Sequence, residues 1–301
     1  MTERHLPTDR RDTVRLAVAQ YQLRRVARPS ETLMRSADLV AAAADRASDF
    51  VVLPELYLME MLSAEPETLR GEAMYARMTS HEPEIAETFR TLALRHRINI
   101  VAGSYLVLDK GRRLNRSVVA LRDGTIHVRD KIHPTPNERE AWALDGGASG
   151  DARIIETDCG PVGIAICYDS EFPELVRHIA DQGAQLLLVP FCTDSRAGHL
   201  RVRLCCQARA IENQIYVATA GVTGILANVD NMDVHYAESA ILTPCDTPFA
   251  RDGIAALVDA QTEGLAIADV RLSDLATARE KGAVRNFHDR RRDLYRVTWG
   301  M

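Results

Sequence analysis

The sequence has no long hydrophobic run: no apolar segment of its 301 residues approaches the roughly 20 residues that a membrane-spanning helix needs. The first twelve residues, M-T-E-R-H-L-P-T-D-R-R-D, also lack the apolar core of a signal peptide. These absences predict a protein that stays in the cytoplasm and does not associate with a membrane.

Cysteine and metal-binding patterns are equally scarce. None of the six cysteines belongs to a C-x-x-C pair, which argues against a disulfide framework or a zinc ribbon and predicts reduced thiols. The nine histidines are scattered, without H-E-x-x-H or H-x-H, and the sequence has no G-x-x-x-x-G-K-[ST]. We therefore expect no metal site, no cofactor and no nucleotide chemistry.

The charge balance excludes a further class of partner. A formal net charge of −5 argues against binding to a phosphate backbone, so we expect no nucleic-acid partner. Residues 279–296 are locally basic, with seven Lys or Arg against three acids, and we interpret them as a solvated tail or a subunit contact. What the sequence does contain is 46% hydrophobic residues, enough for a substantial core.

The first half of the sequence alternates strands with helices. The segment T-V-R-L-A-V-A-Q has the period of two that a strand requires, and Ser30 is a candidate N-cap of the helix after it. That helix ends before the short buried strand D-F-V-V-L. A second helix, with Ile85 and Phe89 on its apolar stripe, leads into the strand N-I-V-A-G-S-Y-L-V-L. Asp123 and Gly124 then predict a tight hairpin turn.

A second alternation of strands and helices follows. The pattern predicts strands near 152–157 and 161–167, a helix over about 172–182, the strand A-Q-L-L-L-V-P, a helix across 199–213 and the strand Q-I-Y-V-A-T-A. Later strands near 234–243, 254–259 and 264–270 precede a short helix for which Ser273 is a candidate cap.

The two alternating halves are expected to form one domain. No linker rich in Pro, Gly or Ser divides them, and no repeat of fixed period is present. We therefore predict a single domain over 13–280 between an N-terminal tail of 1–12 and a C-terminal tail of 281–301. Two α/β halves with antiparallel hairpins indicate two packed sheets with helices on their outer faces, although a doubly wound single sheet fits the same pattern.

Three chemically useful side chains stand where predicted strands end: Glu55 in V-V-L-P-E-L-Y, Lys131 in H-V-R-D-K-I-H and Cys167 in V-G-I-A-I-C-Y-D. Each alone is unremarkable, because a carboxylate or lysine at a strand end is usually solvated and a free cysteine is usually a small core residue. Ligand sites in α/β folds, however, gather beyond the carboxyl ends of strands. Together the three supply what a nucleophilic thiol needs, a base and a cation.

These motifs resemble a known family. P-E-L-Y, then D-K-I-H with a downstream glutamate, then C-Y-D-S-E-F-P-E resemble the three signature regions of the nitrilase, or carbon-nitrogen hydrolase, superfamily, and their spacings fit its layout. The likeness continues through G-A-Q-L-L-L-V-P and Q-A-R-A-I-E-N-Q-I-Y-V-A. The resemblance implies a four-layer α-β-β-α sandwich and hydrolysis of a C–N bond other than a peptide bond.

The resemblance also implies roles for particular residues. Glu55 matches the general base, Lys131 the cation on the oxyanion side and Cys167 the nucleophile that forms a thioester. The family keeps a second glutamate beside the lysine, which corresponds to Glu138 in the T-P-N-E turn, with Glu140 as the competing assignment.

The resemblance extends to the substrate side of the site. The backbone N–H of Tyr168 is a candidate second oxyanion donor, and Cys192 and Thr193 are expected to line the pocket. Cys192 also follows a strand end, so it is a rival nucleophile, but it lacks the motif that surrounds Cys167.

The residues after C-Y-D bear on the substrate. Many members of the family that bind acidic substrates have an arginine there, whereas this sequence has Ser170 and Glu171. An acid near the pocket, with Asp194 adding to its field, favours a neutral or amine-bearing substrate. In the alternative interpretation, of equal weight, Glu171 caps the following helix and Asp194 pairs with Arg196.

The sequence hypothesis is therefore a thiol hydrolase that acts on a small amide or N-carbamoyl compound and releases ammonia or an amine. A nitrilase acting on a small nitrile and a catalytically silent scaffold of the same fold are the alternatives, and a metal-dependent amidohydrolase would lack its usual motif here. The resemblance further implies a homodimer formed through the helices after the cysteine strand, with the C-terminal tail crossing the partner. A larger assembly remains open.

Overall fold

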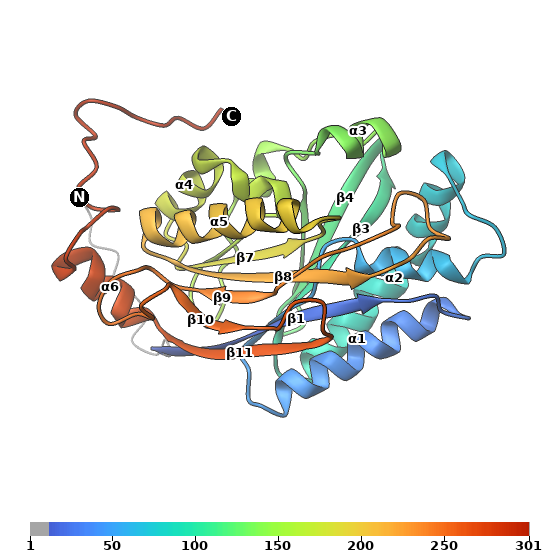
Figure 1. Cartoon of the computed structure of the whole chain (residues 1–301), viewed down its shortest axis with the longest axis horizontal. Helices are drawn as coiled ribbons and strands as arrows, with labels where there is room; N and C mark the ends of the chain where they lie inside the picture. The colour runs from blue at the N-terminus through green and yellow to red at the C-terminus, as the bar shows by residue number, and fades with distance from the viewer. Residues whose placement is uncertain (1–11, 301) are drawn as a thin grey trace.

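The structure, a computed structural model, describes residues 12–300, so the predicted N-terminal tail of 1–12 lies outside the described residues except for Asp12. Its strands form two sheets that are joined at one corner (Figure 1). The first sheet has the order β11-β1-β2-β3-β4-β5, with β11 Gly264–Arg271, β1 Thr13–Leu23, β2 Phe50–Val52, β3 Asn99–Asp109, β4 Arg112–Ala120 and β5 Ile126–Asp130. Within it, β1, β2 and β3 are parallel, and the other three strands pair antiparallel to their neighbours.

The second sheet has the order β6-β7-β8-β9-β10. Its strands are β6 Val162–Ile164, β7 Leu186–Phe191, β8 Tyr216–Gly224, β9 Ala240–Leu242 and β10 Ile254–Leu257. The end of β1 also pairs with the end of β8, so the two sheets are joined at one corner.

Helices cover the outer faces of both sheets (Figure 1). The two faces of β1 show the layering: Leu16 and Val18 pack with the second sheet, whereas Ala17 and Tyr21 pack with α1 Pro29–Ala44 and α2 Gly71–His96. On the other side, α4 Pro173–Asp181 and α5 Arg196–Asn213 cover the second sheet. Strands buried on both faces read as nearly continuous apolar runs, which is why their sequences were recognisable. The predicted four-layer α-β-β-α sandwich is confirmed.

Short helices fill the connections between these layers. They are the 3-10 helices η1 Tyr57–Ala64, η2 Ser149–Ala152 and η3 Cys167–Glu171, and the α-helices α3 Pro136–Trp142 and α6 Leu272–Lys281. The predicted hairpin turn is present between β4 and β5, where Gly124 has a φ of 89° and the Asp123 carboxylate accepts a hydrogen bond from the N–H of Thr125 at 2.8 Å.

Both helix caps predicted from serine are wrong. The N-cap of α1 is Arg28, because the ring of Pro29 already fixes the φ that the first helical residue needs. Ser30 therefore lies within the first turn of the helix instead of capping it. Similarly, α6 begins at Leu272, and the Ser273 hydroxyl instead donates to the Asp12 carboxylate at 2.8 Å.

Three predicted strands are clearly shorter than the sequence pattern indicated. The strand near 161–167 is reduced to β6, Val162–Ile164. Of the strand near 152–157, only Ile155 pairs, in an isolated bridge with Val162, because the chain before it coils into η2. Of the strand near 234–243, only β9 pairs over several residues; His235 forms an isolated bridge with Gly224.

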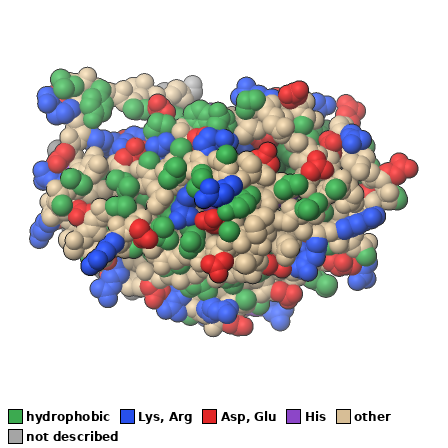
Figure 2. Space-filling model, in the orientation of Figure 1, with side chains coloured by type: hydrophobic (Ala, Val, Ile, Leu, Met, Phe, Trp, Pro, Cys, Tyr) green, Lys and Arg blue, Asp and Glu red, His purple; other side chains and the backbone are tan. Residues whose placement is uncertain are grey.

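The described part of the C-terminal tail contacts α4 of its own chain at two points and runs outside the body of the molecule between them (Figure 1). Arg290 forms an ion pair with Asp181 at 2.7 Å, and the Trp299 ring stacks on His178 with centroids 4.5 Å apart. The expected contact of this tail with a partner subunit, and the homodimer itself, stay predictions. Acidic and basic side chains are interspersed over the face in Figure 2, without a patch of one sign.

Candidate active site

The carboxyl ends of three strands meet at one cavity. Glu55 follows β2, Lys131 follows β5 and Cys167 follows β6, and all three line a cavity of about 660 Å³ together with Glu138 from α3. The cavity therefore contains each side chain to which the sequence assigned chemistry.

A close approach of two backbones places Glu55. The turn after β2 passes over β3, where the Pro54 carbonyl accepts a hydrogen bond from the N–H of Ser104 at 3.2 Å, and the Ser104 hydroxyl accepts one from the N–H of Leu56. A Cβ atom on Gly103 would lie 1.9 Å from the Pro54 oxygen, and Gly103 also has a positive φ of 67°. Only glycine fits here, so Gly103 allows the turn that carries Glu55 to approach the sheet.

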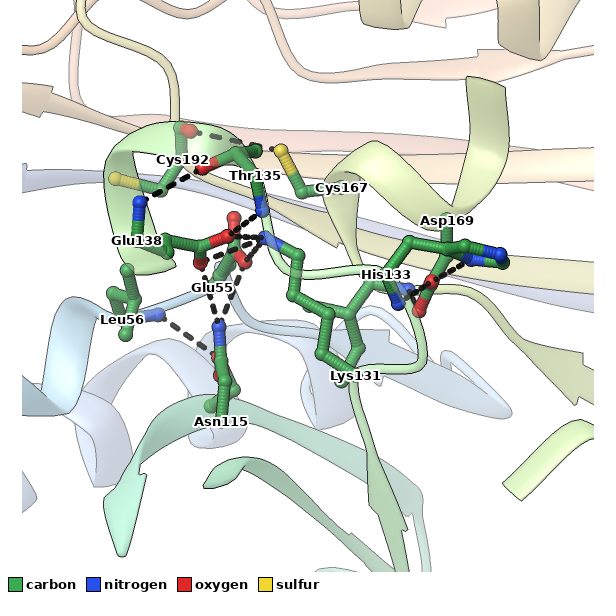
Figure 3. A network of polar contacts seen from close by, with 12 residues as sticks. Glu55, Leu56, Asn115, Lys131, His133, Thr135, Glu138, Cys167, Asp169 and Cys192 are labelled. Atoms are coloured by element: carbon green, nitrogen blue, oxygen red, sulfur yellow. Dashed lines mark hydrogen bonds and ion pairs between the residues drawn. The ribbon is translucent and has the colours of Figure 1, made fainter. Parts of the chain in front are cut away.

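Lys131 lies between two carboxylates (Figure 3). Its Nζ is 2.8 Å from Oε1 of Glu55 and 2.8 Å from both carboxylate oxygens of Glu138, and its side chain is 2% exposed. A buried ammonium is stable only when it is paired in this way. Because two acids surround one base, the buried group carries an excess of negative charge whenever both glutamates are ionised.

A capping box holds Glu138, rather than Glu140, beside Lys131. Thr135 is the N-cap of α3: its hydroxyl accepts from the N–H of Glu138, and Oε2 of Glu138 accepts from the N–H of Thr135 at 2.7 Å. The same carboxylate is thereby held toward Lys131. Glu140 is exposed on α3 and does not line the cavity.

Asn115, on β4, is a site residue that the sequence analysis missed. Its Nδ2 donates to Oε1 of Glu55 at 2.9 Å and lies 3.4 Å from Oε1 of Glu138, and its backbone carbonyl accepts from the N–H of Lys131. Asparagine is uncommon inside strands, so an asparagine in the strand pattern R-R-L-N-R-S-V-V-A was the available signal.

Cys167 is the first residue of η3 rather than the last of a strand. Its φ of 50° is in the left-handed region, which a side-chain-bearing residue adopts only when its surroundings enforce it. Cys167 is 5% exposed and lines the cavity, and its thiol donates to the carbonyl of Cys192 at 3.6 Å.

Asp169, two residues after the thiol, ties the cysteine turn to the lysine loop (Figure 3). Its carboxylate accepts from the backbone N–H groups of Ile132 and His133, and contacts Nδ1 of His133 at 2.8 Å. The Asp169 carboxylate also accepts a hydrogen bond from the N–H of Ile166, the residue just before Cys167. A single side chain thus fixes the distance between the segments that carry Lys131 and Cys167.

Helix α5 holds the cysteine turn from its other side. Arg209 donates to the backbone carbonyls of Ser170 at 3.0 Å and Glu171 at 3.1 Å, and pairs with Glu212 at 2.7 Å. These contacts explain the motif Q-A-R-A-I-E-N, which supplies both members of the pair.

Burial and mutual charge shift the pKa values of these groups. Burial, aided by the charge of Glu138, raises the pKa of Glu55 to about 7 despite the opposing effect of Lys131. For Lys131, burial lowers the pKa, but the charges of Glu138 and Glu55 outweigh it and the pKa stays well above its usual value. Burial and the charge of Glu55 raise the pKa of the Cys167 thiol well above its usual range. The resting arrangement therefore has a neutral thiol, a charged lysine and a glutamate able to exchange a proton near neutral pH.

The four residues predicted on the substrate side, Tyr168, Glu171, Cys192 and Thr193, all line the cavity. Glu171 does not cap α4, whose N-cap is Phe172 without a side-chain hydrogen bond. That alternative is therefore wrong: the Glu171 carboxylate instead accepts from Nε of Arg201 at 3.2 Å, across the cavity mouth from α5.

Asp194 also lines the cavity, and it forms no ion pair with Arg196 within the part of the chain that the structure describes. Among residues 12–300, no group of three or more His, Cys, Asp or Glu side chains could hold a metal ion. Over the same residues, every helix is too short or too polar to cross a bilayer.

Known proteins share sequence similarity with this chain. The family model for carbon-nitrogen hydrolases matches residues 15–280. The chain is 41% identical over 286 residues to the probable hydrolase YhcX of Bacillus subtilis, covering 95% of this chain but 55% of that protein, so it spans about half the length of that relative. It is 30% identical over 290 residues to the omega-amidase NIT2 of Xenopus tropicalis, covering 94% of this chain and 97% of the relative.

Solved structures share the fold. The NitFhit protein of C. elegans superimposes with a TM-score of 0.78 at 24% identity, covering 96% of this chain and 67% of that one. An amidase from Nesterenkonia sp. superimposes with a TM-score of 0.70 at 21% identity, covering 96% of this chain and 97% of the amidase.

Proposed function

Because the chain belongs to the carbon-nitrogen hydrolase family, also called the nitrilase superfamily, we propose that it hydrolyses a small amide or N-carbamoyl compound through a thioester on Cys167. The observation that carries this proposal is the buried lysine held between two glutamates in the cavity that also contains the thiol. The relatives named omega-amidase and amidase support an amide as the substrate.

The first half-reaction forms the thioester. Glu55 takes the proton from the Cys167 thiol as the sulfur attacks the carbonyl carbon, since burial keeps the thiol from ionising alone. The negative charge on the substrate oxygen is stabilised by the Lys131 ammonium and by the backbone N–H of Tyr168. The tetrahedral intermediate then breaks its C–N bond as Glu55 returns the proton to the nitrogen, and ammonia or an amine leaves.

The second half-reaction restores the enzyme. Glu55 deprotonates a water molecule that attacks the thioester carbonyl, and the C–S bond breaks with the proton returning to sulfur. The acid product leaves with an oxygen from water. Removing one donor from an oxyanion site commonly lowers the rate about 10²–10³-fold, which sets the expected importance of Lys131.

The charges around the cavity mouth favour a neutral or amine-bearing substrate. The cavity mouth is lined by three acids, Glu171, Asp194 and Asp233. The cation at the mouth is Arg201, which is already paired with Glu171. Burial lowers the pKa of His235, so that ring adds no positive charge near neutral pH. The resulting negative field attracts an amine and repels a carboxylate.

The test is release of ammonia, or of the amine, from a panel of short amides, ω-amino amides, dicarboxylic monoamides, N-carbamoyl amines and nitriles. Wild type, Cys167→Ala and the matched control Cys192→Ala are compared, and intact mass reports an acyl adduct. We expect turnover of amides or carbamoyl compounds that is lost with Cys167→Ala and kept with Cys192→Ala.

Several outcomes would reject parts of the proposal. Turnover that survives Cys167→Ala would exclude that thiol as the nucleophile, and turnover of nitriles alone would replace the amide assignment. Turnover limited to dicarboxylic monoamides would reject the charge argument at the cavity mouth while leaving the thiol mechanism intact.

A further inference from the structure

We propose that Asn115 is a positioning residue that holds Glu55 and Glu138 on Lys131 and keeps Glu55 able to accept a proton, an inference that rests on the proposed function. The residue is 1% exposed, and both its side chain and its backbone contact the site. Neither the motifs of the sequence nor the predicted roles include it.

Asn115 joins the two glutamates and the lysine through its side chain and its backbone. One amide nitrogen carries two N–H groups, and here it donates to Glu55 at 2.9 Å and lies 3.4 Å from Glu138, while the backbone carbonyl of Asn115 accepts from the N–H of Lys131 at 2.9 Å. A single residue of β4 therefore contacts all three members of the buried charged group (Figure 3). Moving it would displace both carboxylates relative to the ammonium.

The Asn115 amide points its nitrogen, and not its oxygen, at the glutamates. The Asn115 side-chain oxygen is buried and lacks a hydrogen-bond partner among the described residues. The opposite orientation would place that oxygen against two carboxylates, where it would repel them. In the observed orientation the side-chain oxygen has no hydrogen-bond partner in the part of the chain that the structure describes, while the N–H groups face the two carboxylates. This indicates that the position requires a hydrogen-bond donor to the acids.

Asn115 also bears on the proton affinity of Glu55. The titratable groups that face Glu55 are Lys131, Glu138, Cys167 and Cys192, which come from four different segments. Among them Lys131 is the single cation, and Glu138 also contacts it. A neutral donor on Glu55 favours its charged form without adding charge to the site. Without Asn115, Glu55 would hold its proton to a higher pH and would be a poorer base near neutrality.

The experiment compares wild type with Asn115→Ala and Asn115→Asp. The matched control is Ser117→Ala, which changes a buried side chain two residues along β4, outside the cavity. Two quantities are measured from about pH 5 to about pH 10. They are kcat/KM for the preferred amide, and the rate at which iodoacetamide alkylates Cys167, followed on the Cys167 peptide by mass spectrometry.

We expect the acid limb of both profiles to move up by about one pH unit in Asn115→Ala, giving a roughly fivefold loss near pH 7 that is recovered at high pH. Asn115→Asp, which keeps the shape but replaces the donor by a carboxylate, should move it further. The control should leave the limb in place.

A limb that stays fixed, with activity lost equally at every pH, would overturn the inference and leave Asn115 a merely structural residue. If wild type hydrolyses no substrate of the panel, the proposed function fails, but the alkylation profile still decides the role of Asn115. If Asn115→Ala does not fold, Asn115→Ser, which keeps a polar side chain in the strand, takes its place with the same expected direction.

Discussion

Replacing Glu55 with glutamine is expected to abolish hydrolysis and to make the protein more stable at neutral pH. Burial, with the charge of Glu138, raises the pKa of Glu55 from 4.5 to about 7, so the folded chain holds this proton more tightly than the unfolded chain. Protonated Glu55 therefore stabilises the fold, and this contribution is fully present below pH 4.5 and is lost as the pH rises through about 7. At about 1.4 kcal/mol for each pH unit, the loss amounts to about 3 kcal/mol.

Glutamine reproduces the protonated acid at every pH. Its side-chain oxygen can still accept from Lys131 and Asn115, and Lys131 keeps Glu138 as a charged partner, so the remaining buried charges are paired one to one. The variant should therefore escape the loss that wild type suffers on ionisation. A stabilising change that removes the base also fits the general conflict between stability and activity at strained sites.

The assay is urea unfolding of wild type and Glu55→Gln at two pH values. We expect the free energies of unfolding to differ by about 1 kcal/mol or less near pH 5 and by about 3 kcal/mol near pH 8, with the variant the more stable. Glu140→Gln, which changes an exposed acid of α3, is the control and should match wild type at both. A variant no more stable than wild type near pH 8, or a difference that does not grow with pH, would refute this account of the buried charges.

Two further predictions concern the positioning of the site. Asp169→Asn should lower kcat/KM roughly 10²-fold, because the link between the lysine loop and the Cys167 turn loses its charged acceptor; amide turnover within a few-fold of wild type would contradict this. Gly103→Ala should prevent stable folding, since the new methyl group would overlap the Pro54 oxygen. Gly111 also has a positive φ, but no atom of the described residues lies near its added methyl group, so Gly111→Ala should lower the free energy of unfolding by only about 1–2 kcal/mol, measured by thermal unfolding. Equal losses in the two glycine variants would show that the overlap is relieved at little cost.

The parts of the site that the sequence predicted are those that local pattern determines. Glu55 and Cys167 each follow a buried apolar run, whereas Lys131 follows the second strand of the predicted hairpin. In α/β folds, ligand sites gather beyond the carboxyl ends of such strands. The choice between Glu138 and Glu140 was also within reach. The pattern T-x-x-E from Thr135 is a capping box, which turns Glu138 back over the start of its helix and toward the lysine.

The parts that the sequence did not predict depend on contacts between distant segments. Asn115 reaches Glu55 only through the register of β4 with β3 and β5, and no spacing along the chain encodes it. Similarly, Arg201 forms an ion pair with Glu171 because α5 packs against η3. Glu171, which one interpretation of the sequence placed as a helix cap, therefore pairs with an arginine instead. The two predicted helix caps failed for other reasons. A proline already fixes the first turn of α1 ahead of Ser30, and Ser273 lies inside α6, where its hydroxyl donates to Asp12.

One imbalance, two buried carboxylates sharing one ammonium, underlies both the stability prediction and the role proposed for Asn115. If Asn115 favours the charged form of Glu55, then removing it must make ionisation still less favourable, and the loss of stability between pH 5 and pH 8 must become larger in Asn115→Ala than in wild type. In the double variant with Glu55→Gln the group that ionises is gone, so removing the amide should no longer affect this pH dependence. The two substitutions must therefore be non-additive in the pH dependence of stability, because each acts on the same proton. Additive effects would mean that the amide stabilises the strand and not the carboxylate.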